Sequence, residues 1–75
     1  MRNRDFSPSD VGAFLRRKRF EYNYSQSDLA KYSGVNKRMI QQYEIGTKDI
    51  NKAAGVTLLA LAKTLDCEIE DLLEI

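Results

Sequence analysis

The sequence predicts an all-α fold of five helices, and three observations support this prediction. Apolar residues recur at helical spacing in several stretches, most clearly within residues 56–65. Residues that favour helix starts and ends stand at the borders of these stretches. No stretch carries the signals of a strand. We expect residues 1–75 to form one small domain around a single core.

The composition narrows the function classes. The chain has one cysteine and no histidine, which argues against an internal disulfide and against a metal site. We interpret Cys67 as a small apolar core residue. No apolar run is long enough to span a membrane, and the N-terminus does not resemble a signal peptide. We expect a cytoplasmic protein without cofactor or small-molecule ligand.

Charge is distributed unevenly along the chain. The net charge is only +1, but residues 1–52 contain eleven Lys or Arg and six Asp or Glu. Residues 53–75 contain one lysine, Lys63, and five acidic residues. Such a molecule would turn its N-terminal part towards a polyanion.

The first helix is predicted to follow a polar arm of residues 1–6. Arg2 and Arg4 are either a basic arm that follows a polyanion or simply solvated charges. Ser7 and Pro8 predict the helix start, and Asn23 predicts its left-handed end. We expect Arg16 and Arg17 to be solvated, and the buried stripe to comprise Val11, Phe14, Leu15 and Tyr22.

Residues 25–46 predict two short helices joined by a tight turn. Ser25 is a good N-cap for the first, with Asp28 in capping-box position. Gly34 suits a left-handed helix end, and Asn36 can cap the second helix. Small Ala30 lets the helices cross closely, and the inner side of the second helix is expected to hold Ile40 and Tyr43.

This pattern resembles the lambda repressor/Cro-like family of helix-turn-helix regulators, also called the Xre family. The resemblance extends from about residue 11 to about residue 74, and its strongest matches are Ser25, Gln26, Leu29, Ala30, Gly34, Val35, Ile40, Tyr43, Glu44 and Gly46. It implies a compact five-helix, lambda-repressor-like domain in which helices 2 and 3 form the helix-turn-helix. The implied function is a sequence-specific, double-stranded DNA-binding transcriptional regulator of bacterial or phage origin.

The helix at about residues 36–45 is the expected reader of the major groove. Its outer side offers side chains that hydrogen-bond base edges, and no acidic residue lies between Gly34 and Tyr43. The candidate base-reading residues are Asn36, Lys37, Arg38, Gln41 and Gln42.

Other residues are expected to hold the DNA backbone or the fold. Ser25 and Gln26 stand at a helix N-terminus, which attracts phosphate, and Lys48 and Lys52 lie in the loop after the reading helix. The resemblance also implies a structural ion pair between Arg19 and Glu44, which would hold the first helix against the third.

The C-terminal third is predicted to complete the core. We expect Asn51 to act as an N-cap, and the fourth helix to start either at Lys52 or only after Gly55. Asp66 is expected to end it in the left-handed region, and a short fifth helix to open at Glu70. The inward residues of the fourth helix would be Val56, Leu58, Leu59, Leu61, Ala62 and Leu65, followed by Cys67 and Ile69.

The end of the chain also predicts a homodimer. A short fifth helix cannot bury all of its apolar side chains against its own core, which leaves a surface for a second copy formed by Ile69, Leu72, Leu73 and Ile75. A two-fold dimer would bind a palindromic operator.

The expected regulator is a repressor, and the alternatives are an enzyme, an antitoxin and a purely structural helical bundle. A structural bundle would not predict a helix face without acidic residues. An enzyme finds no support, because the sequence lacks a nucleophile–base arrangement and a phosphate-binding glycine loop. The second alternative is an antitoxin that binds a partner toxin and autoregulates its promoter. Antitoxins often carry a disordered segment that wraps the toxin, and we expect none after residue 75.

Overall fold

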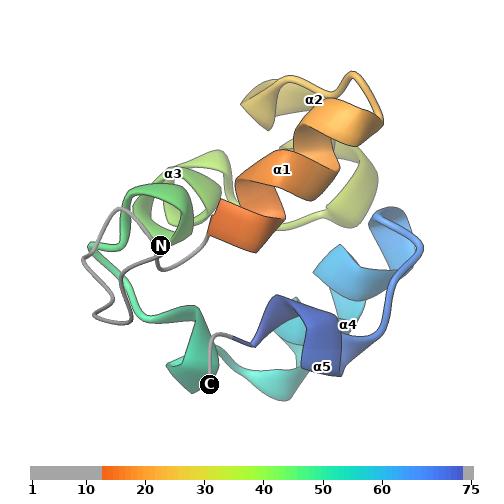
Figure 1. The fold of residues 1–75 in the computed structure, drawn as a ribbon. Helices are drawn as coiled ribbons and strands as arrows, with labels where there is room; N and C mark the ends of the chain where they lie inside the picture. Colours follow the sequence, from red (N-terminus) through yellow and green to blue (C-terminus); the bar gives the residue numbers. More distant parts are fainter. Residues whose placement is uncertain (1–12, 74–75) are drawn as a thin grey trace, which may run out of the picture.

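The computed structural model describes residues 13–73, which form five α-helices and one 3₁₀ turn (Figure 1). These are α1 (Ala13–Glu21), α2 (Gln26–Ser33), α3 (Lys37–Ile45), η1 (Ile50–Lys52), α4 (Gly55–Thr64) and α5 (Ile69–Leu72). No strand occurs in this range, so the predicted all-α class is confirmed. The predicted arm of residues 1–6, the helix start at Ser7 and Pro8, the inward Val11 and the C-terminal Ile75 lie outside the described residues.

One core joins all the helices. In Figure 1, α1, α2 and α3 lie together, and α4 and α5 lie beside one another below them. The helix α2 contacts both α3 and α4, and therefore links the two groups. The core is built from Leu15, Leu29, Val35, Ile40, Tyr43, Ile50, Leu58, Leu61, Ala62, Leu65 and Leu72. Each large aliphatic side chain buried here contributes about 1.5–3 kcal/mol of hydrophobic stabilisation.

The helix-turn-helix has the caps that the sequence predicts. At the start of α2, the Ser25 hydroxyl accepts from the Asp28 N–H at 2.9 Å, and the Ser25 N–H donates to the Asp28 carboxylate at 2.9 Å. Gly34 follows α2 with a φ of 78°, the left-handed conformation that glycine adopts without strain. Asn36 then caps α3 through its side-chain oxygen. Together these caps satisfy the backbone groups on both sides of the turn.

The end of α1 differs from the predicted stripe. Asn23 adopts the expected left-handed conformation with a φ of 58°, but the helix already ends at Glu21. Tyr22 therefore leaves the helical periodicity and lies exposed, so its predicted burial is wrong. Tyr24, beyond the turn, packs partly against the core instead.

The region before α4 contains a turn that the sequence did not predict. Asp49 caps η1 by accepting the Asn51 N–H at 2.9 Å. Asn51 lies within this turn and Ala54 is the N-cap of α4, so the prediction that Asn51 caps the fourth helix is wrong. The helix α4 begins at Gly55 itself, one residue before the later of the two predicted starts and not at Lys52. Val56 consequently lies in its first turn and is 77% exposed, which corrects its assignment to the core; Leu59 is exposed as well.

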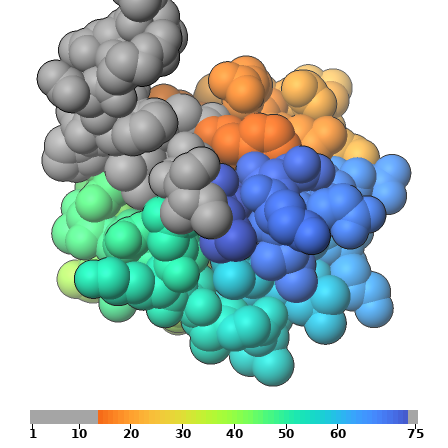
Figure 2. Space-filling model, turned by 60° about the horizontal axis from the view of Figure 1, so that its bottom comes forward, coloured from red at the N-terminus to blue at the C-terminus, as the bar shows by residue number. Residues whose placement is uncertain are grey.

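The last helix belongs largely to the core of its own chain. Figure 2 shows the dark blue residues of α5 between the orange residues of α1 and the lighter blue residues of α4. Leu72 is buried there, so it cannot form part of the dimer surface to which the sequence assigned it. Ile69, Leu73 and Cys67 are half-buried and pack against the core. Asp66 turns the chain into this segment with a φ of 52°, as predicted.

None of the helices within residues 13–73 has the length and apolar character that crossing a membrane would require.

Candidate nucleic-acid interface

The third helix has two chemically distinct faces. Its inner face is buried and consists of Ile40, Tyr43 and Glu44. The outer face presents the five residues predicted to read bases: Asn36, Lys37, Arg38 and Gln41 are exposed, and Gln42 is half-buried. Sequence reasoning missed Ile45, which is 59% exposed at the end of this helix and adds an apolar group to it.

Most of the outer side chains of α3 have no partner within the described chain. No hydrogen bond or ion pair inside residues 13–73 engages the side chains of Lys37, Arg38, Gln41 or Gln42. No carboxylate lies among them in the sequence. Their donors and acceptors are therefore available to a ligand, and the charge of this face is positive.

Asn36 is an exception, because it also serves the fold. Its side-chain oxygen accepts from the N–H groups of Arg38 at 2.7 Å and Met39 at 3.4 Å. A bidentate contact with adenine needs both that oxygen and the amide nitrogen. The cap therefore leaves Asn36 with its NH₂ group as a donor only.

The start of α2 offers two further groups that can contact a ligand. The Ser25 hydroxyl accepts one bond and keeps its own proton for donation. Gln26 Nε2 donates to Glu44 Oε1 at 3.1 Å, which leaves its second N–H unused. Gln26 thus links α2 to α3, and the 18 residues that separate the two partners explain why the sequence did not show this role.

An ion pair fixes α3 against α1. Arg19 donates from Nε to Glu44 Oε2 at 2.7 Å and from a terminal nitrogen to Oε1 at 2.8 Å. Arg19 is 7% exposed and Glu44 2% exposed, so the pair lies inside the protein. A third Arg19 donor reaches the Tyr24 carbonyl at 3.0 Å. This two-bond geometry matches the fork of the guanidinium to the carboxylate.

Arg16 reinforces the same junction, contrary to the expectation that it is solvated. Its guanidinium donates to the backbone carbonyl of Glu44 at 3.0 Å. That carbonyl belongs to the last turn of α3, where carbonyl groups lack helical partners and a cation is favourable. The position of α3 is therefore set by contacts from both neighbouring helices.

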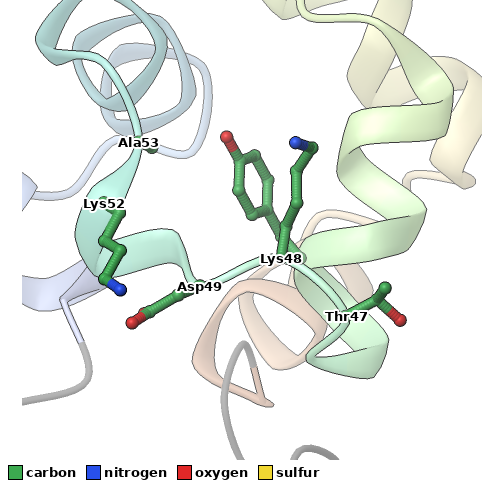
Figure 3. Close-up of a pocket in the computed structure, with 6 residues that line it drawn as sticks. Thr47, Lys48, Asp49, Lys52 and Ala53 are labelled. Atoms are coloured by element: carbon green, nitrogen blue, oxygen red, sulfur yellow. The ribbon is translucent and has the colours of Figure 1, made fainter.

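Lys48 and Lys52 lie on a shallow cleft beyond the C-terminus of α3. The cleft has a volume of about 380 Å³ and is lined by Tyr43, Thr47, Lys48, Asp49, Lys52 and Ala53 (Figure 3). The Lys48 N–H donates to the Gln42 carbonyl at 3.1 Å, which folds the loop back onto the last turn of α3. Figure 3 shows the two lysine side chains extending in different directions, Lys52 on the side of Asp49. Within residues 13–73, neither lysine forms an ion pair.

Comparisons with known proteins agree with this architecture. The helix-turn-helix family matches residues 15–72. An uncharacterised HTH-type transcriptional regulator, y4mF from Sinorhizobium fredii, is 38% identical over 72 residues, which is 93% of this chain and 88% of the relative. The crystal structure of the restriction-modification controller protein C.AhdI from Aeromonas hydrophila superposes with a TM-score of 0.74 at 31% identity, covering 87% of this chain and 94% of that one.

Proposed function

Because the chain belongs to the helix-turn-helix family of DNA-binding transcriptional regulators, we propose that it is a repressor that acts in the cytoplasm on its own operator. The single observation that carries this proposal is the outer face of α3, where Lys37, Arg38, Gln41 and Gln42 have no side-chain partner within the described chain and no acidic residue lies among them in the sequence. The names of the two relatives, a transcriptional regulator and a restriction-modification controller, support a role in gene control.

In the proposed complex, α3 enters the major groove and Arg38 and Gln42 read base edges. The two residues are four apart on one helix and lie on the side opposite the buried Ile40 and Tyr43. Arginine pairs with the O6 and N7 atoms of guanine, and glutamine with the N6 and N7 atoms of adenine. Lys37 and Gln41, on the flank of the same face, are candidates for a neighbouring base pair.

Phosphate contacts would come from two segments of the chain. The start of α2 supplies the free protons of Ser25 and Gln26 together with the positive end of the helix dipole. Lys48 and Lys52 supply charge from the loop and turn that follow α3. These contacts would fix the protein on the duplex without distinguishing sequences.

We further propose that the operator is palindromic and is bound by a two-fold dimer. Two reading helices about 34 Å apart would meet half-sites one helical turn apart. Support comes from apolar side chains that the fold leaves uncovered: Val56 and Leu59 on α4, and the half-buried Ile69 and Leu73 at α5. Occupying a promoter in this way would block transcription. The alternative of an antitoxin with a toxin partner stays a prediction.

The experiment first selects binding sites for the protein from random duplexes, and then compares Arg38→Ala with Lys48→Ala on the selected and a scrambled site. Arg38→Ala should lose about 1–3 kcal/mol on the selected site alone and relax the preference at one base pair. Lys48→Ala should weaken both duplexes alike and reduce the slope of log K against log salt by about one. Equal losses on both duplexes for Arg38→Ala would make it a backbone contact, and absence of any selected site would refute the proposal.

A further inference from the structure

The cleft beyond α3 contains a polar group that neither the fold nor the expected base contacts use. Tyr43 is only 3% exposed, and it belongs to the hydrophobic core. Its hydroxyl nevertheless forms no hydrogen bond to any residue of the described chain.

The Tyr43 hydroxyl is not sealed in the interior. No fully buried side-chain nitrogen or oxygen in residues 13–73 lacks a partner, so the unpaired Tyr43 oxygen must retain contact with solvent. Tyr43 lines the α3–η1 cleft, where that contact occurs. Desolvation raises the pKa of Tyr43 above its usual value of 10.0, which keeps the hydroxyl protonated and able to donate.

Lys48 lines the same cleft as Tyr43. The backbone N–H of Gly46 donates to the Tyr43 carbonyl at 3.3 Å, and that of Lys48 to the Gln42 carbonyl at 3.1 Å. These two bonds wrap the loop tightly around the last turn of α3, and both side chains line the same cleft. The cleft thus offers a neutral donor and a cation, each without a partner in the described chain. A phosphate group, with its charged oxygens, can accept from both.

The remaining charges of the cleft favour Lys48 over Lys52 as the partner of Tyr43. Lys52 extends on the side of Asp49, whose carboxylate reduces the positive potential there (Figure 3). One oxygen of that carboxylate is already held by the Asn51 N–H at 2.9 Å. The negative group is thereby kept on the η1 side of the cleft.

We propose that the Tyr43 hydroxyl and the Lys48 ammonium bind the same phosphodiester of the DNA backbone, making Tyr43 a DNA-binding residue as well as a core residue. This inference rests on the proposed function, because it presupposes that the end of α3 meets DNA. The contact is independent of base sequence, so any duplex can reveal it.

The test measures affinity for a mixed-sequence 30-base-pair duplex (a length of about three helical turns) by fluorescence anisotropy at several salt concentrations. Tyr43→Phe, which removes one oxygen atom, should weaken binding about threefold to tenfold. The salt slope should not change, because a neutral donor displaces no counterion, whereas Lys48→Ala should lower it by about one. Tyr22→Phe, at an exposed position just after α1, is the matched control and should bind like the parent protein.

Two combined variants establish whether the phosphate is shared. The loss from Tyr43→Phe should shrink in the Lys48→Ala background, because the pair acts on one group, and should stay the same in the Lys52→Ala background. Urea unfolding of Tyr43→Phe should show undiminished stability, since the hydroxyl has no partner in the described chain.

Unchanged affinity of Tyr43→Phe, additive losses with Lys48→Ala, or a loss of stability would each overturn the inference while leaving the proposed function intact. Failure of the parent protein to bind any duplex would instead defeat the proposed function itself.

Discussion

The Arg19–Glu44 pair allows a quantitative prediction about how α3 is held. Both side chains are almost fully buried, and their two bonds of 2.7 and 2.8 Å leave little room for water. Replacing Glu44 by leucine would leave the guanidinium charge buried without its counterion, which should cost about 3–5 kcal/mol. At roughly 0.05–0.15 kcal/mol per residue, the whole chain is stable by only about 4–11 kcal/mol. Glu44→Leu alone, or Arg19→Met alone, should therefore leave the protein close to unfolding.

The double variant should recover much of that loss. Arg19→Met together with Glu44→Leu removes both charges and keeps apolar volume, and such replacements are often close to neutral. We expect a coupling energy of about 3 kcal/mol from a double-mutant cycle measured by urea unfolding and circular dichroism. Urea is chosen because guanidinium chloride would screen charges.

Lys18 and Glu21 provide the control cycle. Their single contact of 3.4 Å lies at the surface, and its coupling should be indistinguishable from zero. A coupling for Arg19 and Glu44 equally close to zero would refute the argument that this pair positions α3.

Three further predictions concern caps and turns. Asn36→Ala should lower stability by about 1 kcal/mol in urea unfolding, because two α3 N–H groups lose their acceptor. Asp66→Gly should raise the melting temperature, with a gain of up to about 1 kcal/mol, since glycine adopts the φ of 52° without strain. Hydrogen bonds from Ser25 hold the Asp28 pKa below its ordinary 3.8, so the stabilisation by Asp28 should be complete above that pH and fade as pH falls below it. Asp28→Asn should abolish this part of the acid dependence in unfolding measured across pH; an unaltered profile would contradict the assignment.

The helix-turn-helix could be predicted from the sequence because its signals are local. Ser25, Gly34 and Asn36 act on backbone groups within three or four residues, and the structure reproduces their roles. The same holds for the inward positions of Ile40 and Tyr43, which helical periodicity fixes once the cap is known.

Features that depend on distant residues could not be read in this way. In α4, apolar residues occur on nearly every side, so composition could not tell the exposed Val56 from the buried Leu58. Tyr22 was misplaced because the exact end of α1 decides its direction. The bonds of Gln26 and Arg16 to Glu44 span 18 and 28 residues, and only the packed structure brings these partners together.

The convergence of Arg16, Arg19 and Gln26 on Glu44 has a consequence for how such a protein can change during evolution. The groups that orient α3 all approach it from the inside, whereas the described chain makes no use of the side chains of Lys37, Arg38 and Gln41. Substitutions on the outer face can therefore alter the preferred DNA sequence with little penalty in folding. The same fold could therefore come to recognise new operators through a few substitutions on the outer face of α3. The interior contacts would meanwhile keep the orientation of α3 in the protein unchanged.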